Sequence, residues 1–296
     1  MAPIFSSILS SSLLLLSAIK LPSVQAWEGD LPFGNDLGYF ECSDDDISRI
    51  GIALGNTVTL AASALSLALN NDRANINAYT HYFRTDQRTP PDHKMFEAAM
   101  TAAIYSITPP NGNRPFEWKI ECVPQAAGTA CGPESRAITE WEPNVENPTM
   151  FICPSFHTAR DTRRTLQEDG ICDNARNKVF ADFETGGHTL LHELTHFDGF
   201  GILATMPLYT SPRSGGVASH GTDDWRQRTT QRLARDLVGN PQGGIDTWRN
   251  AENHAAAATE YFFQTLCEID NIPLTRFDSS TCPQGCTCNG PVPLCS

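Results

Sequence analysis

Apolar side chains recur at helical spacing from Asp44 to Leu69, and this stretch opens with a run of aspartates. Acidic residues interact favourably with the dipole at the start of a helix, so the pattern predicts one long helix packed on the rest of the chain. Shorter helical patterns follow over Ile76–Arg84 and, after a Pro-Pro-Asp start signal, over His93–Ile107.

The pattern changes between Phe116 and Cys153, where short runs rich in Trp, Ile, Cys and Phe are separated by Gly, Pro and Asn. The runs WKIEC and TMFIC have the length and composition of strands in a small sheet. A short strand region between helical regions predicts an α+β fold that is mainly helical.

Helical patterns return in the second half of the chain. The first covers Thr185–Gly199, where the final glycine is expected to end the helix. A loop rich in Gly, Pro and Ser covers Gly201–Gly221, and two further helical stretches cover Asp223–Val238 and Arg249–Glu268. Beyond Ile272 the chain has little to bury and is rich in cysteine, so we expect its own disulfides to hold it.

The N-terminus predicts export. Residues 1–26 contain the apolar stretch Ser11–Ile19 and end in Val24-Gln25-Ala26, which has small side chains where signal peptidase cleaves. The apolar stretch is shorter than the ~20 residues that a bilayer span needs, and no other run is expected to reach that length. Ten cysteines fit an oxidising compartment, so we expect a secreted, extracellular and disulfide-bonded protein.

Charge and size exclude some partners. The net charge of −13 repels phosphate backbones and anionic lipids, so we expect no nucleic acid and no membrane partner. With 296 residues, 40% of them hydrophobic, the chain can build a core without a second copy, and we expect a monomer.

The segment His192–His196, HELTH, carries the strongest chemical signal. On a helix its two histidines project from one face and can grip one metal ion, and a chance occurrence has an expectation on the order of 0.01. Zinc held by two neutral imidazoles and a carboxylate lowers the pKa of bound water and polarises a peptide carbonyl, while Glu193 can carry the water's proton to the leaving amine. His188 lacks an adjacent glutamate and is expected to pack against or support the ligands.

The third ligand is open at this point. The metzincin pattern is excluded because Ile202 stands where its third histidine belongs. A thermolysin-like site would take Glu252 or Glu260 from a later helix. Alternatively, the segment His220–Trp225 presents two carboxylates beside a glycine-containing turn, although the same segment could be an ordinary helix start capped by its threonine or first aspartate.

These residues resemble the aspzincins, the fungal deuterolysin and peptidyl-Lys metalloendopeptidase family, whose signature is HExxH followed by Gly-Thr-x-Asp-x-x-Tyr-Gly. The second part begins here at Gly221-Thr222-Asp223-Asp224. The resemblance covers about residues 40–268 and implies that Asp224 is the third zinc ligand. It also implies a single zincin-like metallopeptidase domain over residues 27–270, followed by a cysteine-rich tail at 271–296.

The resemblance implies a disulfide pattern as well. Matching the cysteines by their order suggests the pairs Cys42 with Cys122, Cys131 with Cys153 and Cys172 with Cys267. The tail cysteines, which are Cys282, Cys286, Cys288 and Cys295, would then pair among themselves. The segment Asn250–His254 is comparable to a late Asn-Ala-Asp-Ser-Tyr helix of the family.

The chain departs from the family at three positions. The family tyrosine three residues after the aspartate is replaced by Gln227, and the glycine after that tyrosine is replaced by Arg228. A second family tyrosine is replaced by Phe156. A tyrosine hydroxyl that donates to the developing oxyanion lowers the barrier by a few kcal/mol. Slower or altered catalysis is therefore predicted unless Gln227, His220 or another donor substitutes.

Two functions follow from these observations. The leading hypothesis is a secreted endopeptidase that binds one Zn²⁺ and acts on proteins or peptides, with Glu193 as general base. The alternative is a non-catalytic zinc-binding or zinc-scavenging surface protein, similar to fungal zinc-binding antigens related to this fold. Missing tyrosines and a cysteine-rich tail favour the alternative, whereas the retained Glu193 opposes it, because metal capture needs no general base.

Overall fold

The computed structural model describes residues 38–85, 93–105, 107, 118–123, 131–132, 135–139, 148–210, 217–225, 230–239, 245–274, 286–287 and 294–295. The expected signal peptide at 1–26 lies outside these residues, and so do Gln227 and Arg228. Of the tail at 271–296, the description covers residues 271–274 and two short strands.

Helix α2 (Asp44–Leu69) confirms the long helix that the sequence predicts, at both of its ends. The side chain of Ser43 accepts the backbone N–H of Asp46, whose carboxylate accepts the backbone N–H of Ser43, so the N-terminus is capped reciprocally. By length and composition α2 could cross a membrane, contrary to the expectation for the chain beyond residue 26. However, 56% of its most apolar window is buried inside the protein, as in a core helix.

The other predicted helices are present with shifted ends. The region 76–84 contains only α3 (Asn77–Thr80), and α4 (His93–Tyr105) fills most of the helix predicted over 93–107. Two short helices, α5 (Pro154–Thr158) and α6 (Arg160–Arg163), follow the strand region, and the 3₁₀ turns η3 (Ala175–Asn177) and η4 (Phe180–Asp182) lead on from them. The second half holds α7 (Gly186–His196), α8 (Asp198–Leu203), α9 (Gln231–Gly239) and α10 (Ala251–Cys267).

A four-stranded mixed sheet confirms the α+β class. Its order is β1 (Gly38–Phe40), β2 (Lys119–Cys122), β4 (Thr149–Ile152) and β3 (Ala137–Thr139). The two runs predicted as strands form the central pair β2 and β4, which are parallel, as are β1 and β2. Strand β3 pairs antiparallel with β4 and forms an edge of the sheet.

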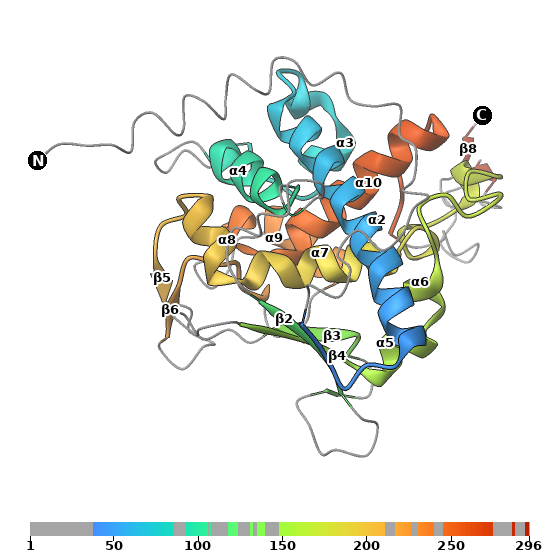
Figure 1. Ribbon diagram of the computed structural model, residues 1–296. Coiled ribbons are helices and arrows are strands. Elements are labelled where there is room, and N and C mark those ends of the chain that lie inside the picture. Colours follow the sequence, from blue (N-terminus) through green and yellow to red (C-terminus); the bar gives the residue numbers. More distant parts are fainter. Residues whose placement is uncertain are drawn as a thin grey trace, which may run out of the picture.

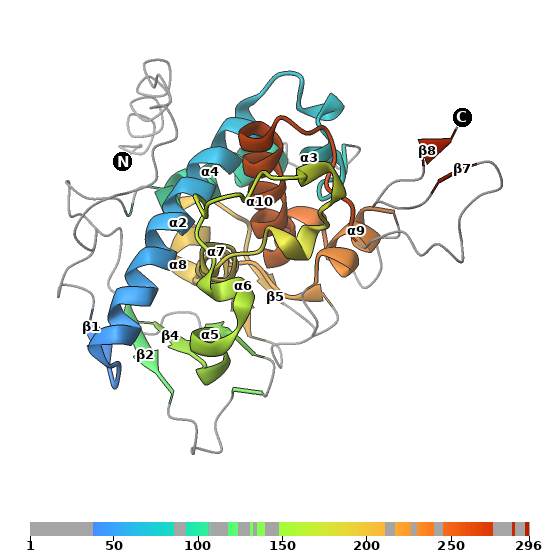
Figure 2. The same ribbon diagram turned by 90° about the vertical axis from the view of Figure 1, so that its right-hand side faces the viewer.

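Helix α7 lies between the sheet and a layer of helices that includes α2, α4 and α10 (Figure 1). The hydroxyl of Thr139 on β3 donates to the backbone carbonyl of Glu193 over 3.0 Å, which fixes α7 on the sheet edge. On the other side Gly187 touches α2 so closely that a Cβ would clash with Asn56. In Figure 2 α7 is seen with other elements on both sides. Because it is covered in this way, nearly all of its side chains are buried.

Three disulfides confirm the suggested pairs Cys42–Cys122, Cys131–Cys153 and Cys172–Cys267. The last ties the end of α10 to the chain ahead of α7, and together they are consistent with an oxidising compartment. In the tail, strands β7 (Cys286–Thr287) and β8 (Leu294–Cys295) set Cys286 opposite Cys295. The disulfide pairing of the four tail cysteines lies outside the description.

Two predicted helix boundaries are wrong. The helix predicted to end at Gly199 ends at His196, because Phe197 adopts extended backbone, and Gly199 lies inside the following helix α8. The helix predicted to begin at Asp223 begins at Gln231. The loop predicted between them contains the end of α8 and a hairpin of β5 (Tyr209–Thr210) and β6 (Ala218–Ser219).

Candidate metal centre

The side chains of His192 and His196 lie side by side on helix α7, as their spacing predicts. The Nε2 atoms of His192 and His196 lie 3.2 Å apart, and the planes of the two rings are inclined at 80°. Both residues are buried. The hydroxyl of Thr185 accepts the backbone N–H of His188 and caps the start of this helix, so the pair projects from a well-anchored element.

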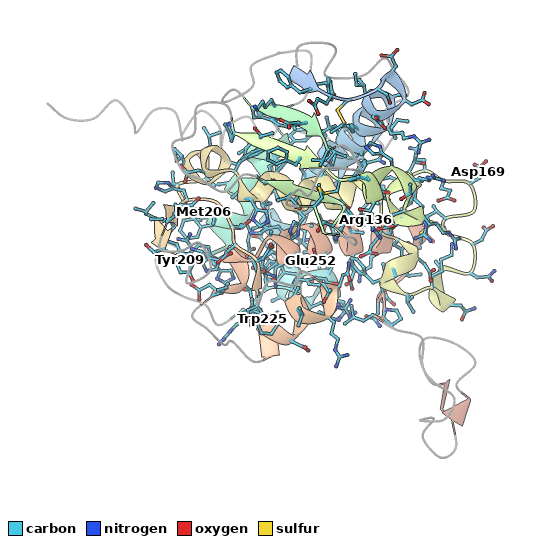
Figure 3. The ribbon with its side chains drawn as sticks, turned by 90° about the horizontal axis from the view of Figure 1, so that it is seen from below. Arg136, Asp169, Met206, Tyr209, Trp225 and Glu252 are labelled. Atoms are coloured by element: carbon cyan, nitrogen blue, oxygen red, sulfur yellow. A yellow bond between two sulfur atoms is a disulfide. The ribbon has the colours of Figure 1, made fainter. Side chains whose placement is uncertain are left out.

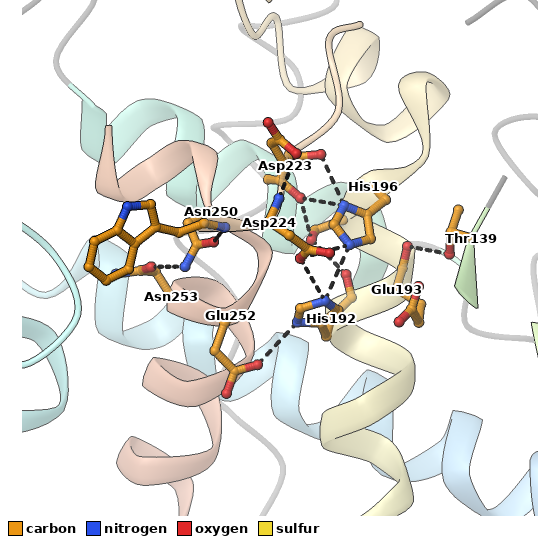
Figure 4. Close-up of polar contacts among 12 residues, drawn as sticks. Thr139, His192, Glu193, His196, Asp223, Asp224, Asn250, Glu252 and Asn253 are labelled. Carbon is orange, nitrogen blue, oxygen red and sulfur yellow. Dashed lines mark hydrogen bonds and ion pairs between the residues drawn. The ribbon is translucent and has the colours of Figure 1, made fainter. Parts of the chain in front are cut away.

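Asp224 supplies a third atom at the same point. Its Oδ1 lies 3.2 Å from the Nε2 of His192 and 3.4 Å from the Nε2 of His196 (Figure 4). The three atoms therefore form a nearly equilateral triangle, which we call the donor triangle. Glu193 stands beside it: one of its carboxylate oxygens and a ring nitrogen of each histidine lie within 4.8 Å of one another.

The start of α10 holds Asp224 in place from behind. Asp223 and Asn250 form a parallel β-bridge, in which two backbone hydrogen bonds of 2.7 and 2.9 Å join Asp223 to the neighbours of Asn250. The side-chain oxygen of Asn250 accepts the backbone N–H of Trp225 over 2.9 Å. Asp224 is thus fixed on both sides, and the next α-helix in the chain, α9, begins at Gln231.

The turn before Asp224 rests on the end of α7. A Cβ at Gly221 would clash with the carbonyl oxygen of His196, so only glycine allows this approach. One residue later the carbonyl of Thr222 accepts a hydrogen bond from the Nδ1 of His196 over 3.0 Å, and its hydroxyl lies 2.7 Å from that of Thr195. Figure 4 shows this turn and α10 meeting at the two imidazoles.

The outer nitrogen of each ring has a hydrogen-bond acceptor. A carbonyl can only accept, so the contact with Thr222 places a hydrogen on Nδ1 of His196. The Nδ1 of His192 lies 3.1 Å from the Oε2 of Glu252. Burial works to raise the pKa of Glu252, but the charges and hydrogen bonds of His188 and His192 outweigh it and lower the pKa to about 2, so this carboxylate is ionised and accepts.

Charge at the triangle favours a cation. Burial opposes charging of His192, but its contacts with Asp224 and Glu252 and the charges of Asp224 and Glu193 outweigh it and raise the pKa of His192 well above its usual value. Burial likewise opposes the charge of Asp224, but His196 and His192 hold the pKa of Asp224 well below its usual range. The surrounding carboxylates therefore stabilise positive charge between the rings, whether a proton or a metal ion carries it.

The donor set fits zinc. With hydrogens on both Nδ1 atoms, neutral rings direct their Nε2 lone pairs at each other and at Asp224, which is unfavourable without a cation between them. The Oδ1 of Asp224 is buried and has no hydrogen-bond partner among the described residues. Zinc bonds of 2.0–2.1 Å in a tetrahedron separate two ligand atoms by about 3.3–3.4 Å, close to the edges of the donor triangle.

The other carboxylates considered as ligands lie elsewhere. Glu252, labelled in Figure 3, contacts His192 at Nδ1, on the opposite side of the ring from the donor triangle. Glu260 is fully buried and accepts hydrogen bonds from Arg235 and from His81. His188 supports Glu252, because its Nε2 lies 3.3 Å from a carboxylate oxygen of that residue.

Neither Phe156 nor His220 supplies a hydroxyl in place of a family tyrosine. Phe156 is buried in the core beside the start of α7 and carries no polar atom on its ring. Gln227 lies outside the described residues. The ring of His220 is partly exposed and its Nδ1 lies 3.1 Å from a carboxylate oxygen of Asp198.

A second cluster of metal-ligating residue types, Asp46, Cys122 and His157, is less suited to a metal, because the sulfur of Cys122 is bound in a disulfide with Cys42. A carboxylate oxygen of Asp46 lies 3.0 Å from the Nδ1 of His157 instead.

No protein-family model matches the chain, and no curated protein matches it either. The resemblance to the aspzincins therefore rests on the motif residues and on the cysteine order.

Proposed function

We propose that this protein is a secreted, zinc-dependent metalloendopeptidase. His192, His196 and Asp224 would hold one zinc ion, and Glu193 would act as general base. The observation that carries the proposal is the donor triangle itself, with edges of 3.2, 3.2 and 3.4 Å and a further carboxylate beside it. The choice of peptide bonds as substrate is supported by the resemblance to the aspzincins.

Bound zinc supplies Lewis acidity, which acidifies water and polarises a carbonyl. The protein's part is proton transfer by Glu193, whose carboxylate lies next to the donor triangle without forming one of its corners. From there it takes a proton from the attacking water and delivers it to the nitrogen of the leaving amine. Its backbone is fixed by Thr139 on the sheet edge, which limits movement of this part of α7.

A non-catalytic zinc-binding protein is the second candidate. Phe156 favours it, because a buried phenyl ring without a hydroxyl stands where the resemblance places a second family tyrosine. Both candidates share the zinc site and differ only in whether bond cleavage follows. Glu193 is the residue that separates them.

The test compares purified wild-type protein with Glu193→Gln on denatured casein. Wild type is expected to bind one zinc per chain and to cleave in a chelator-sensitive manner. The glutamine variant should keep the zinc and lose cleavage by about 10²–10⁴-fold, the usual contribution of a general base. Glu168→Gln, at an exposed glutamate, is the matched control and should behave as wild type.

A zinc-loaded Glu193→Gln protein that cleaves at the wild-type rate contradicts the role of Glu193. Zinc-loaded wild type that cleaves neither casein nor peptides supports the second candidate instead. If the purified wild-type protein binds no zinc, both candidate functions are contradicted.

A further inference from the structure

Glu252 lies at the junction of α7 and α10 and contacts two histidines of α7. We propose that Glu252 is a positioning residue for the metal site: it holds the ring of His192 in the orientation and tautomer that zinc binding needs, and His188 with Thr259 holds Glu252. This inference rests on the proposed zinc site and deepens it, because it adds a determinant of zinc affinity that does not touch the metal.

Each carboxylate oxygen of Glu252 lies close to an imidazole nitrogen. Its Oε2 lies 3.1 Å from the Nδ1 of His192, and its Oε1 lies 3.3 Å from the Nε2 of His188. The Nδ1 of His188 lies 2.9 Å from the hydroxyl of Thr259, which stands on α10 as Glu252 does. The four side chains therefore form a continuous polar chain between two helices, and all four are buried.

The surroundings leave this chain little freedom. Phe180 packs against the ring of His188 at a centroid distance of 5.8 Å, and α10 contributes a run of buried alanines at 255–258. A buried carboxylate keeps its charge only where partners replace its water, so the two imidazoles fix where Glu252 can lie. In turn, His192 has no second described acceptor at Nδ1, and the position of Glu252 decides how its ring is turned.

The two rings of the donor triangle are held differently. His196 donates to a neutral backbone carbonyl, whereas His192 donates to a charged carboxylate. A hydrogen bond to a charged acceptor is about twice as strong as one between neutral groups, and it makes the opposite nitrogen of the ring a better electron donor. His192 is therefore the ligand whose strength a side-chain substitution can alter without touching the donor triangle.

The experiment measures the zinc dissociation constant by competition with a chromophoric chelator. Glu252→Gln preserves size and removes the charge, and it is expected to weaken zinc binding by about 10–100-fold. Glu260→Gln is the matched control: Glu260 is also buried on α10 and also contacts a histidine, at 2.8 Å, but that histidine is His81. Its zinc affinity should stay within about twofold of wild type, even where the variant is less stable.

A spectroscopic measurement separates positioning from loss of fold. With cobalt(II) in place of zinc, Glu252→Gln should shift the visible absorption bands, which report ligand strength and geometry, whereas Glu260→Gln should not. Should Glu252→Gln fail to be secreted, Thr259→Val removes the hydroxyl at the far end of the chain and keeps its shape. That variant is expected to weaken zinc binding by roughly two- to tenfold.

Several outcomes would overturn the inference. Wild-type zinc affinity in Glu252→Gln would do so, as would an equal loss in Glu252→Gln and Glu260→Gln, because both would show that the charge at 252 does not set affinity. If Thr259→Val is the only variant that can be obtained, wild-type zinc affinity in that variant would also overturn the inference. Wild type that binds no zinc is a different failure, since it removes the proposed function together with this inference.

Discussion

Asp223 and Asp224 are adjacent carboxylates with different surroundings. The side chain of Asp223 turns back and accepts the backbone N–H of Asp224 over 2.7 Å, and its backbone pairs with the start of α10. The side chain of Asp224 points the other way, at the two imidazoles. One aspartate therefore shapes the turn while the next completes the donor triangle.

Substituting each aspartate by asparagine tests this division. Asp224→Asn removes the charged corner of the triangle and should weaken zinc binding by more than about 100-fold, the upper end of losses seen when outer partners are removed. Asp223→Asn keeps a carbonyl oxygen that can accept the same N–H, so its zinc affinity should stay within about threefold of wild type. Isothermal titration with zinc measures both, and the reverse order of effects would place the third ligand at Asp223.

Residue spacing could predict only the local part of this site, and Asp224 was named as a ligand only through the resemblance to the aspzincins. Two histidines four residues apart share a helix face wherever that helix lies, so their pairing follows from spacing. By contrast, Glu252 and His192 are 60 residues apart, and Thr222 and His196 are 26 apart. No local pattern links such partners. The sequence therefore suggested Glu252 only as a possible metal ligand, since its place behind the ring of His192 depends on how α7 and α10 pack.

Among the elements, helix α2 shows what local patterns can establish. Its ends follow from the cap at Ser43 and from apolar spacing that runs unbroken to Leu69. The end of α7 does not follow from such signals, because Phe197 leaves the helix to bury its ring against Trp118, at a centroid distance of 5.6 Å. A long-range contact thus overrides the glycine that was expected to end the helix.

The contact of the 220–224 turn with α7 predicts a specific sensitivity at Gly221. In Gly221→Ala the added Cβ clashes with the carbonyl of His196, so the turn must move away and carry Thr222 and Asp224 with it. We expect zinc affinity to fall at least tenfold, with a lower melting temperature. Gly239→Ala is the control, because a Cβ there meets nothing within 4 Å, and it should be neutral or slightly stabilising.

Both variants can be compared by thermal unfolding and by chelator competition. If Gly221→Ala binds zinc as wild type does, the turn can relax without displacing Asp224, and the close contact has no influence on the site.

For the whole molecule, the disulfides determine how far the chain can spread when it unfolds. Cys172–Cys267 spans 95 residues and closes a loop that contains α7 and α10, whereas Cys131–Cys153 spans 22 residues near the sheet. In the chain-entropy account a longer closed loop restricts the unfolded state more. The two disulfides should therefore differ in their contribution to the free energy of unfolding.

Removing each pair as a double serine variant tests that difference. Loss of Cys172–Cys267 should lower the free energy of unfolding by about 5 kcal/mol, and loss of Cys131–Cys153 by about 3 kcal/mol. Urea unfolding of the purified variants measures both values. Equal losses, or a larger loss for the shorter loop, would show that native contacts around each bridge matter more than loop length.

The bridge between Asp223 and Asn250 also bears on the order of events as the chain folds. Asp224 reaches the imidazoles only once the start of α10 lies beside its turn, so the donor triangle has no complete form in a partly folded chain. Before that moment His192 and His196 lack their third partner, and two imidazoles alone bind zinc far more weakly than a closed set. In the proposed function, loading of this site with zinc therefore belongs to the last stage of folding.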